Sequence, residues 1–193
     1  LRAILKFAGV DSQSINEETI GFTLAPRINA VGRLADADLA VQLILTDNPE
    51  EAENIATEMD ALNKARQALV TSITAEAIEE VEKNYPPTTN KVLVIAKEGW
   101  NAGVVGIVAA RLVDKYYRPT IVLNLDPEKG HAKGSARSIA GFDLFKNLST
   151  CADILPHFGG HPMAAGMTLN LEDVAELRSR LNILAGEQLT DED

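Results

Sequence analysis

Cysteine is almost missing from this chain of 193 residues, because Cys151 is the only one. A single thiol cannot form an internal disulfide, which favours a reducing, cytoplasmic setting. The chain opens without the basic segment and apolar run of a secretory leader, and no apolar stretch approaches the length of a membrane span. The sequence therefore predicts no membrane contact, and its opening at Leu1 in an apparent mid-helix indicates a piece of a longer protein.

Positive charge is scarce as well, since the chain carries a formal net charge of −10. This balance argues against nonspecific binding of nucleic acid by bulk electrostatics. Residues 97–168 depart from it, because they hold eight lysines and arginines against six acidic residues. We therefore expect any anionic ligand to be held locally, by a few arginines and backbone amides.

The pattern of apolar residues divides the chain into three parts. Residues 1–46 contain short helical pieces, the last of them at 38–45. Residues 47–87 begin with Asp47, Asn48 and Pro49, a helix start, and then run without glycine or proline from 51 to 84. Such a helix is roughly 50 Å long at 1.5 Å per residue. We expect it to connect two bodies and to end before Pro86 and Pro87.

Residues 88–193 alternate strand and helix, which predicts an α/β domain with a mixed or mostly parallel sheet flanked by helices. The predicted strands are 92–96, 120–124, 131–138 and 167–170, and the predicted helices are 103–117, a short one from 142, and 172–185. The acidic residues from 186 onward are expected to be frayed.

The segment 157–166 is the most informative part of the sequence. Gly159 and Gly160 allow a sharp turn and a close approach, and His161 follows directly. Pro162 suits the first turn of a helix, so the segment predicts a helix start that binds an anion through its free N–H groups. A tight helix entry with a hydrogen-bonded histidine is the alternative.

A second segment, 134–138, also favours phosphate binding. On a strand, Ser135 and Arg137 lie on one face, and the planar guanidinium fork of Arg137 suits a phosphate. A polar edge strand with a surface ion pair is the alternative.

Two further segments hold candidate ligand-binding residues. Trp100 and Asn101 follow the strand at 92–96, whereas the small residues of the next helix are better explained by packing. Arg27, Asn29 and Arg33 lie in a segment, 25–34, without clear helical periodicity. Arginine there can bind a ligand or stack on a base, and structural salt bridges are the alternative.

A metal centre is not expected. Asp153, His157 and His161 recur every four residues, but Pro156 and the two glycines make a continuous helix improbable. Only His131 remains as a further imidazole, and no nucleophile–histidine–acid arrangement is evident.

Taken together, these segments resemble the RecJ family, bacterial exonucleases specific for single-stranded DNA that belong to the DHH phosphoesterase superfamily. The resemblance covers nearly the whole chain and runs in order through residues 25–34, 98–109, 117–120, 134–138 and 158–166.

The resemblance implies a DHHA1 domain from about residue 88, preceded by the connecting helix of the family. It implies that Ser135 and Arg137 bind a 5′-terminal phosphate and that Arg27 contacts the first bases. It also implies that His161, with Gly159 and Gly160, faces the scissile phosphate. No Asp-His-His motif occurs in the sequence, so Mn²⁺ or Mg²⁺ would be bound by a DHH domain outside this chain.

One departure concerns Asn101, since many relatives carry histidine there. Asparagine still forms hydrogen bonds, but it does not act as an acid or base near neutral pH.

The leading hypothesis is therefore the substrate-binding half of a cytoplasmic 5′→3′ exonuclease that acts on single-stranded DNA in repair and recombination. Its partners would be the DHH domain, a single-strand-binding protein and a helicase. The rival hypotheses are a phosphodiesterase for short oligoribonucleotides or cyclic dinucleotides, and a non-catalytic interaction domain.

Overall fold

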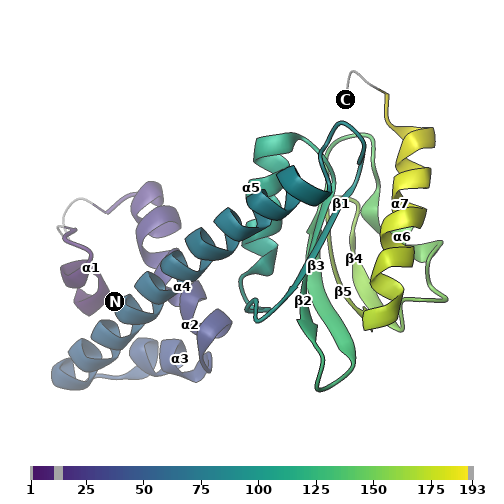
Figure 1. Cartoon of the computed structure of the whole chain (residues 1–193). Helices are drawn as coiled ribbons and strands as arrows, with labels where there is room; N and C mark the ends of the chain where they lie inside the picture. The colour runs from purple at the N-terminus through teal and green to yellow at the C-terminus, as the bar shows by residue number, and fades with distance from the viewer. Residues whose placement is uncertain (1, 11–14, 191–193) are drawn as a thin grey trace. The chain divides into compact units, whose positions relative to one another are not determined.

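The computed structural model describes residues 2–10 and 15–190, and the chain divides into two compact units, Leu1–Leu69 and Val70–Asp193 (Figure 1). Among the described residues, none of the helices combines the length and apolar character that crossing a membrane requires.

The N-terminal unit is helical. It consists of α1 (Arg2–Phe7), the π-helix η1 (Thr19–Leu24), α2 (Ala25–Leu34), α3 (Asp38–Leu45) and the first part of α4 (Pro49–Asn84). Apolar side chains from every one of these helices meet in one core, which includes Ile4, Leu24, Val31, Leu43 and Met59.

Helix α4 begins as the sequence predicts. The Oδ1 of Asn48 accepts hydrogen bonds from the backbone N–H groups of Glu50 at 3.0 Å and Glu51 at 3.4 Å. These bonds satisfy two donors that have no partner within the helix, and the two carboxylates interact favourably with the helix dipole. The 36-residue helix ends at Asn84, ahead of the two prolines.

The segment 25–34, which lacks clear helical periodicity in the sequence, is nevertheless a helix. The backbone N–H of Ala25 donates to the carbonyl of Ile20, the wider spacing of a π-helix. This wider turn precedes Pro26, which lies in the first turn of α2 and needs no backbone N–H there. Pro26, which in the sequence suggests the end of a helix, is thus accommodated inside a continuous helical segment.

The C-terminal unit contains the predicted mixed sheet. Its strands are β1 (Leu93–Glu98), β2 (Thr120–Asp126), β3 (His131–Arg137), β4 (His157–His161) and β5 (Ala164–Asn170), in the spatial order β1-β2-β3-β5-β4. Only the β1–β2 pair is parallel among these neighbours. Helix α5 (Val105–Tyr116) follows β1, α6 (Leu144–Ser149) precedes β4, and η2 (Leu171–Asp173) leads into α7 (Val174–Gln188).

One face of the sheet forms the main core. Alternate residues of β2, β3 and β5 are buried there with side chains of α6 and α7, among them Ile121, Ala136, Met167, Leu148 and Leu177. The opposite face of β2 and β3 contacts α5. Because one face is filled by the main core, only side chains on the opposite face of the sheet can be reached by a ligand.

The segment 157–166 forms a β-hairpin, so the predicted helix start at Pro162 is wrong. Gly160 explains why a strand forms: a Cβ there would lie 2.3 Å from the carbonyl oxygen of Ala164 and 2.6 Å from the Cα of Ala165. The close approach expected of the glycines therefore occurs between two paired strands, and Pro162 lies in the turn that joins them.

The C-terminal segment is more ordered than the acidic composition suggests. Helix α7 continues to Gln188, the side chain of Leu189 is buried, and Nζ of Lys91 donates to the carbonyl of Leu189 at 2.8 Å. The predicted fraying from Gly186 is therefore wrong up to residue 190, and residues 191–193 lie outside the described part.

Candidate functional site

The register of β3, β5 and β4 places four of the predicted site residues on one face of the sheet. Residues directly opposite each other in antiparallel strands project to the same face. Arg137 pairs with Ala164, which pairs with His161; Ser135 pairs with Gly166, which pairs with Gly159. These two adjacent rows lie on the face opposite the main core.

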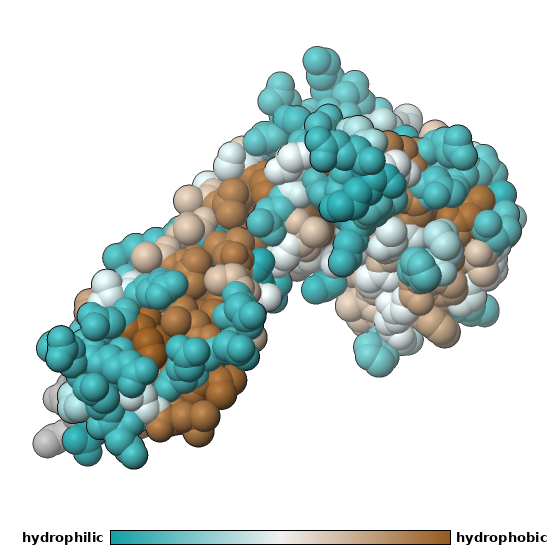
Figure 2. All heavy atoms as spheres, turned by 90° about the horizontal axis from the view of Figure 1, so that it is seen from below, coloured by the Kyte–Doolittle hydropathy of each residue, from teal (hydrophilic) through white to brown (hydrophobic). Residues whose placement is uncertain are grey.

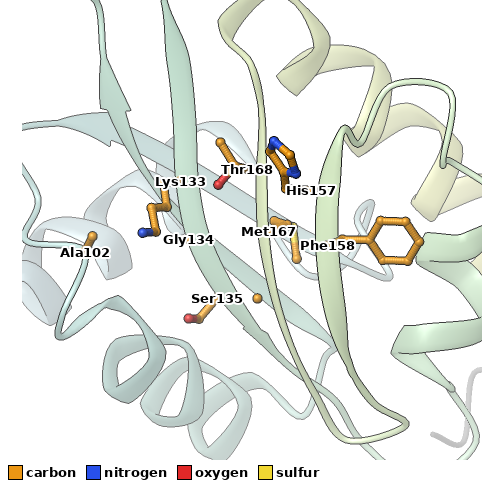
Figure 3. Close-up of a pocket in the computed structure, with 9 residues that line it drawn as sticks. Ala102, Lys133, Gly134, Ser135, His157, Phe158, Met167 and Thr168 are labelled. Atoms are coloured by element: carbon orange, nitrogen blue, oxygen red, sulfur yellow. The ribbon is translucent and has the colours of Figure 1, made fainter. Parts of the chain in front are cut away.

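The half of this face formed by β5 and β4 is open in the described part of the chain. Gly159, Gly166 and His161 are exposed. A hollow of about 370 Å³ lies beside the strands, and its lining includes Gly166 and Ser135. Figure 3 shows Ser135 on one side of this hollow and Ala102, from the loop before α5, beyond it. The site is thus a shallow surface rather than a closed pocket.

Helix α5 lies against Ser135 and Arg137 because Gly106 has no side chain. A Cβ at Gly106 would lie 3.2 Å from Nη2 of Arg137 and 3.3 Å from the Cβ of Ser135. The Nη1 of Arg137 donates to the carbonyl of Ala136 at 2.7 Å, which helps to fix the orientation of the guanidinium. Gly106 is one of the small residues of this helix for which a packing role is expected, and its missing Cβ leaves space for the guanidinium of Arg137.

The hairpin that carries His161 is anchored at its turn. The carbonyl of Met163 accepts a hydrogen bond from the backbone N–H of Ser138 at 3.0 Å, and the carbonyl of Pro162 accepts one from Leu144 at 2.9 Å. These bonds fix the turn next to His161, whose ring is exposed. Gly160 alternates to the opposite face, so its contribution is the close strand approach rather than a surface for ligand.

Trp100 and Asn101 do not lie on the two rows. The indole of Trp100 is only 3% exposed, and its Nε1 donates to Oε2 of Glu76 at 3.1 Å. The ring therefore presents no open surface for a base. The Oδ1 of Asn101 accepts from the backbone N–H of Gly103 at 2.8 Å and so shapes the loop before α5.

Glu76 of α4 contacts both this loop and the end of β1. It accepts hydrogen bonds from both Lys97 Nζ, at 2.6 Å, and the Trp100 indole. The bond from Lys97, followed by that from Trp100, lowers the pKa of the Glu76 carboxyl. A charged group on α4 thus positions the segment that leads to Ala102 and α5.

Arg27, Asn29 and Arg33 lie on α2 in the N-terminal unit. The Nε of Arg27 donates to Oδ1 of Asp60 at 3.0 Å, and its Nη1 donates to the carbonyl of Thr23 at 2.8 Å. The hydrogen bond from Lys64 is the main reason that the pKa of Asp60 is lowered. Arg27 therefore forms the structural salt bridge that was the alternative for this segment, whereas Asn29 and Arg33 are exposed.

In the residues that the structure describes, no group of three histidine, cysteine or acidic side chains has the geometry to hold a metal ion. Asp153 pairs with Arg180 at 2.8 Å instead. His157 and His161 share a face, but β4 is a strand, so four residues separate their Cα atoms by roughly 13 Å.

Three residues that line the same hollow were missed as ligand-binding candidates: Lys133, His157 and Thr168. The signal for Lys133 was available, since it precedes Ser135 by two residues and therefore shares its face. The other two required the strand pairing, which the sequence does not contain.

The model of the DHHA1 domain family matches residues 89–187. The chain belongs to the DHHA1 domain family. The match spans the whole sheet of the C-terminal unit, including both rows that carry Arg137 and His161.

The similarity extends beyond the DHHA1 domain to both units. The chain is 60% identical over 193 residues to the single-stranded-DNA-specific exonuclease RecJ of Bacillus subtilis, covering 100% of this chain and 24% of that protein. It matches RecJ from Thermus thermophilus in complex with Mg²⁺ with a TM-score of 0.84 and 28% identity, over 97% of this chain and 28% of that one. The complex of the same protein with Mn²⁺ matches equally well, with a TM-score of 0.84, 28% identity and coverage of 97% and 27%.

The chain thus spans about a quarter of the length of these relatives. The predicted resemblance to RecJ and the predicted fold class, a mixed sheet with flanking helices after a long helix, are confirmed.

Proposed function

We propose that this chain is the substrate-binding half of a metal-dependent 5′→3′ exonuclease that degrades single-stranded DNA in repair and recombination. The observation that carries the proposal is the placement of Ser135, Arg137, Gly159 and His161 in two adjacent rows on one face of the sheet, whose β5–β4 half is open. The similarity of the whole chain to RecJ supports it.

Ser135 and Arg137 bind the 5′-terminal phosphate in this proposal. The guanidinium of Arg137 offers a planar fork of donors that matches phosphate oxygens, and the hydroxyl of Ser135 adds a donor on the same face. Gly106 lets α5 lie against these two side chains without a Cβ that would crowd them.

His161 faces the scissile phosphate, with Gly159 shaping the surface beside it and Gly160 allowing the close approach of β5 that holds the strand in place. Two strand spacings separate β3 from β4, so the Cα atoms of Arg137 and His161 are about 10 Å apart. The exposed imidazole of His161 can donate a hydrogen bond to a phosphate oxygen in either protonation state. It stabilises charge on the phosphate, while the terminal phosphate fixes the register of the strand.

The other predicted residues have less direct roles in this proposal. Asn29 and Arg33, exposed one turn apart on α2, contact the strand, and Asp60 orients Arg27 toward the first bases. Trp100 acts through its loop, because its ring is buried, and Asn101 provides polar atoms near the hollow.

The metal belongs to the remainder of the parent protein in this proposal. Two divalent ions can activate water and stabilise both oxygens of a displaced phosphate. The described residues offer no ligand set for them, whereas the RecJ structures are complexes with Mg²⁺ or Mn²⁺. The isolated chain is therefore expected to bind DNA without cleaving it.

A DHH domain of the same protein is the proposed partner of the N-terminal unit. Figure 2 shows hydrophobic atoms gathered on the surface of this unit. Val41, Ile44 and Leu45 of α3 are exposed large apolar side chains of the same unit. An apolar surface of this kind is typical of a face that packs against another domain. Cytoplasmic location and partnership with a single-strand-binding protein and a helicase rest on the resemblance alone.

The first test compares binding of three fluorescent ligands to the chain at low salt. These are a DNA single strand with a 5′ phosphate, the same strand with a 5′ hydroxyl, and a short ribodinucleotide. The proposal predicts that the phosphorylated strand binds most tightly. Preference for the ribodinucleotide would favour the phosphodiesterase alternative, and equal binding of both DNA strands would contradict recognition of the 5′ end.

A further inference from the structure

A third row of side chains lies beside the two rows of the proposed phosphate site. Lys133 of β3 pairs with Thr168 of β5, and Thr168 pairs with His157 of β4. This row shares the face of Ser135, because Lys133 precedes it by two residues on the strand. All three side chains line the hollow of about 370 Å³, as Figure 3 shows, whereas the ring of Phe158 points away toward α6.

The polar groups of this row are not paired with other groups in the described part of the chain. Among the residues that the structure describes, the Lys133 ammonium, the Thr168 hydroxyl and the His157 ring have no hydrogen-bond or ion-pair partner. The neighbouring Lys129 is different, since its Nζ pairs with Asp126 at 3.0 Å. Lys133 and His157 are also exposed, so a ligand reaches them without displacing an internal contact.

The charge of the three strands points to an anion. Strands β3, β5 and β4 contain no acidic residue, although the chain has 28 of them. The same strands hold Lys133, Arg137 and all three histidines of the chain. Because strand residues alternate between faces, these five side chains all project to the face opposite the main core.

We propose that Lys133, Thr168 and His157 bind a further phosphate group, beside the phosphate held by Ser135 and Arg137 and distinct from the scissile phosphate at His161. This inference rests on the proposed function, since it extends the same ligand along the sheet. Adjacent rows lie two residues apart, or about 7 Å along a strand. Lys133 supplies the positive charge, and Thr168 and His157 each supply a hydrogen-bond donor.

The test is the salt dependence of DNA binding by the chain, measured by fluorescence anisotropy between about 50 and 200 mM KCl. Each phosphate contact on a single strand contributes about 0.7 to the slope of log K against log[salt]. Lys133→Gln is therefore expected to make the slope shallower by about 0.7 on a 5′-phosphorylated strand. The control Lys146→Gln, the same charge change at an exposed position on α6, leaves the slope unchanged.

A second variant tests the hydroxyl without changing charge. Thr168→Val keeps the shape of the side chain and is expected to weaken binding about threefold, with the slope unchanged. Far-ultraviolet circular dichroism of each variant establishes that the fold is intact.

DNA single strands with different 5′ ends show which phosphate this row binds. A slope change with Lys133→Gln on both 5′-phosphate and 5′-hydroxyl strands identifies an internucleotide phosphate, and a change only on a 5′-diphosphate strand identifies a terminal diphosphate. An unchanged slope on every strand, or an equal change with Lys146→Gln, overturns the proposal.

Failure of the proposed function gives a separate result. If the wild-type chain does not distinguish the two 5′ ends while Lys133→Gln still makes the slope shallower, the proposed recognition of the 5′ end is wrong. The proposed phosphate site of Lys133, Thr168 and His157 is then still supported. If wild type distinguishes the ends and Lys133→Gln has no effect, only the third row fails. Absence of binding to any strand overturns both.

Discussion

Gly134 is the position where a single missing Cβ allows β3 to lie against β2. A Cβ there would lie 2.0 Å from the carbonyl oxygen of Val122 and 2.9 Å from the Cα of Leu123. Both contacts involve backbone, which cannot move without disturbing the sheet. The same strand carries Ser135 and Arg137, so Gly134 supports the site as well as the fold.

Gly134→Ala is therefore expected to lower the free energy of unfolding by about 1–3 kcal/mol, as overpacking does. Urea denaturation measures this difference. Gly166→Ala is the matched control, because the nearest atom to its Cβ would be the Gly134 carbonyl oxygen at 3.9 Å. Equal stability of the two variants would contradict the steric account.

Glu76 is a second residue whose side chain contributes to the stability of the fold. Its carboxylate accepts hydrogen bonds from Lys97 and Trp100, which lower its pKa from the ordinary 4.5. A carboxyl with a lowered pKa in the folded state stabilises the protein above its unfolded pKa. This stabilisation is lost as pH falls through the lower pKa of the folded state.

We predict that Glu76→Gln destabilises the chain at neutral pH and that its difference from wild type shrinks in acid, below the ordinary value of 4.5. Denaturation followed by the fluorescence of Trp100, the only tryptophan, measures both. Glu79→Gln, the same charge change at an exposed position of α4, controls for net charge. A difference that stays constant with pH would contradict the account.

At the scale of elements, α7 protects the free edge of β1. Asn182 accepts a hydrogen bond from the backbone N–H of Val92 at 3.0 Å and donates to the carbonyl of Val92 at 2.9 Å. Arg178 donates to the carbonyl of Val94 and lies 4.1 Å from the ring centroid of Tyr85. These side chains take the place of a neighbouring strand at an edge that would otherwise be unpaired.

Asn182→Ala should cost about 1–3 kcal/mol of unfolding free energy, because the two backbone groups of Val92 then lose their partners. The exposed Ser179 on the same helix offers the control Ser179→Ala, which should change the stability little. Hydrogen exchange of the Val92 amide gives an independent readout. Unaltered protection of that amide in Asn182→Ala would refute the edge-covering role.

The elements differ in how far the sequence predicts them. Helix α4 and strands β1, β2 and β3 were predictable because apolar periodicity and local start and stop signals decide them. The end of β5 was predicted as a strand at 167–170, but β4 and the turn were not, since proline after two glycines fits a helix start and a strand turn equally well. The hairpin depends on pairing of β5 with β3, a contact far away in the sequence.

At the scale of the whole molecule, the candidate site is a product of strand register. Ser135 and Arg137 were predictable as a pair from alternation along one strand, whereas their proximity to His161 requires the order β3-β5-β4. Trp100 illustrates the opposite case, because an aromatic residue at the end of a strand looked like a ligand group and is buried. Its tertiary partner, Glu76, lies 24 residues earlier on α4.

The central claim is that Arg137 recognises the 5′ phosphate, and Arg137→Ala tests it most directly. The measurement is the ratio of affinities for 5′-phosphate and 5′-hydroxyl single strands, determined on the chain at low salt. Loss of charged hydrogen bonds worth about 1.5–3 kcal/mol is expected to lower this ratio by about tenfold or more. Arg111→Ala, at an exposed position on α5, should preserve the ratio. An equal loss of affinity for both strands in Arg137→Ala would contradict the assignment.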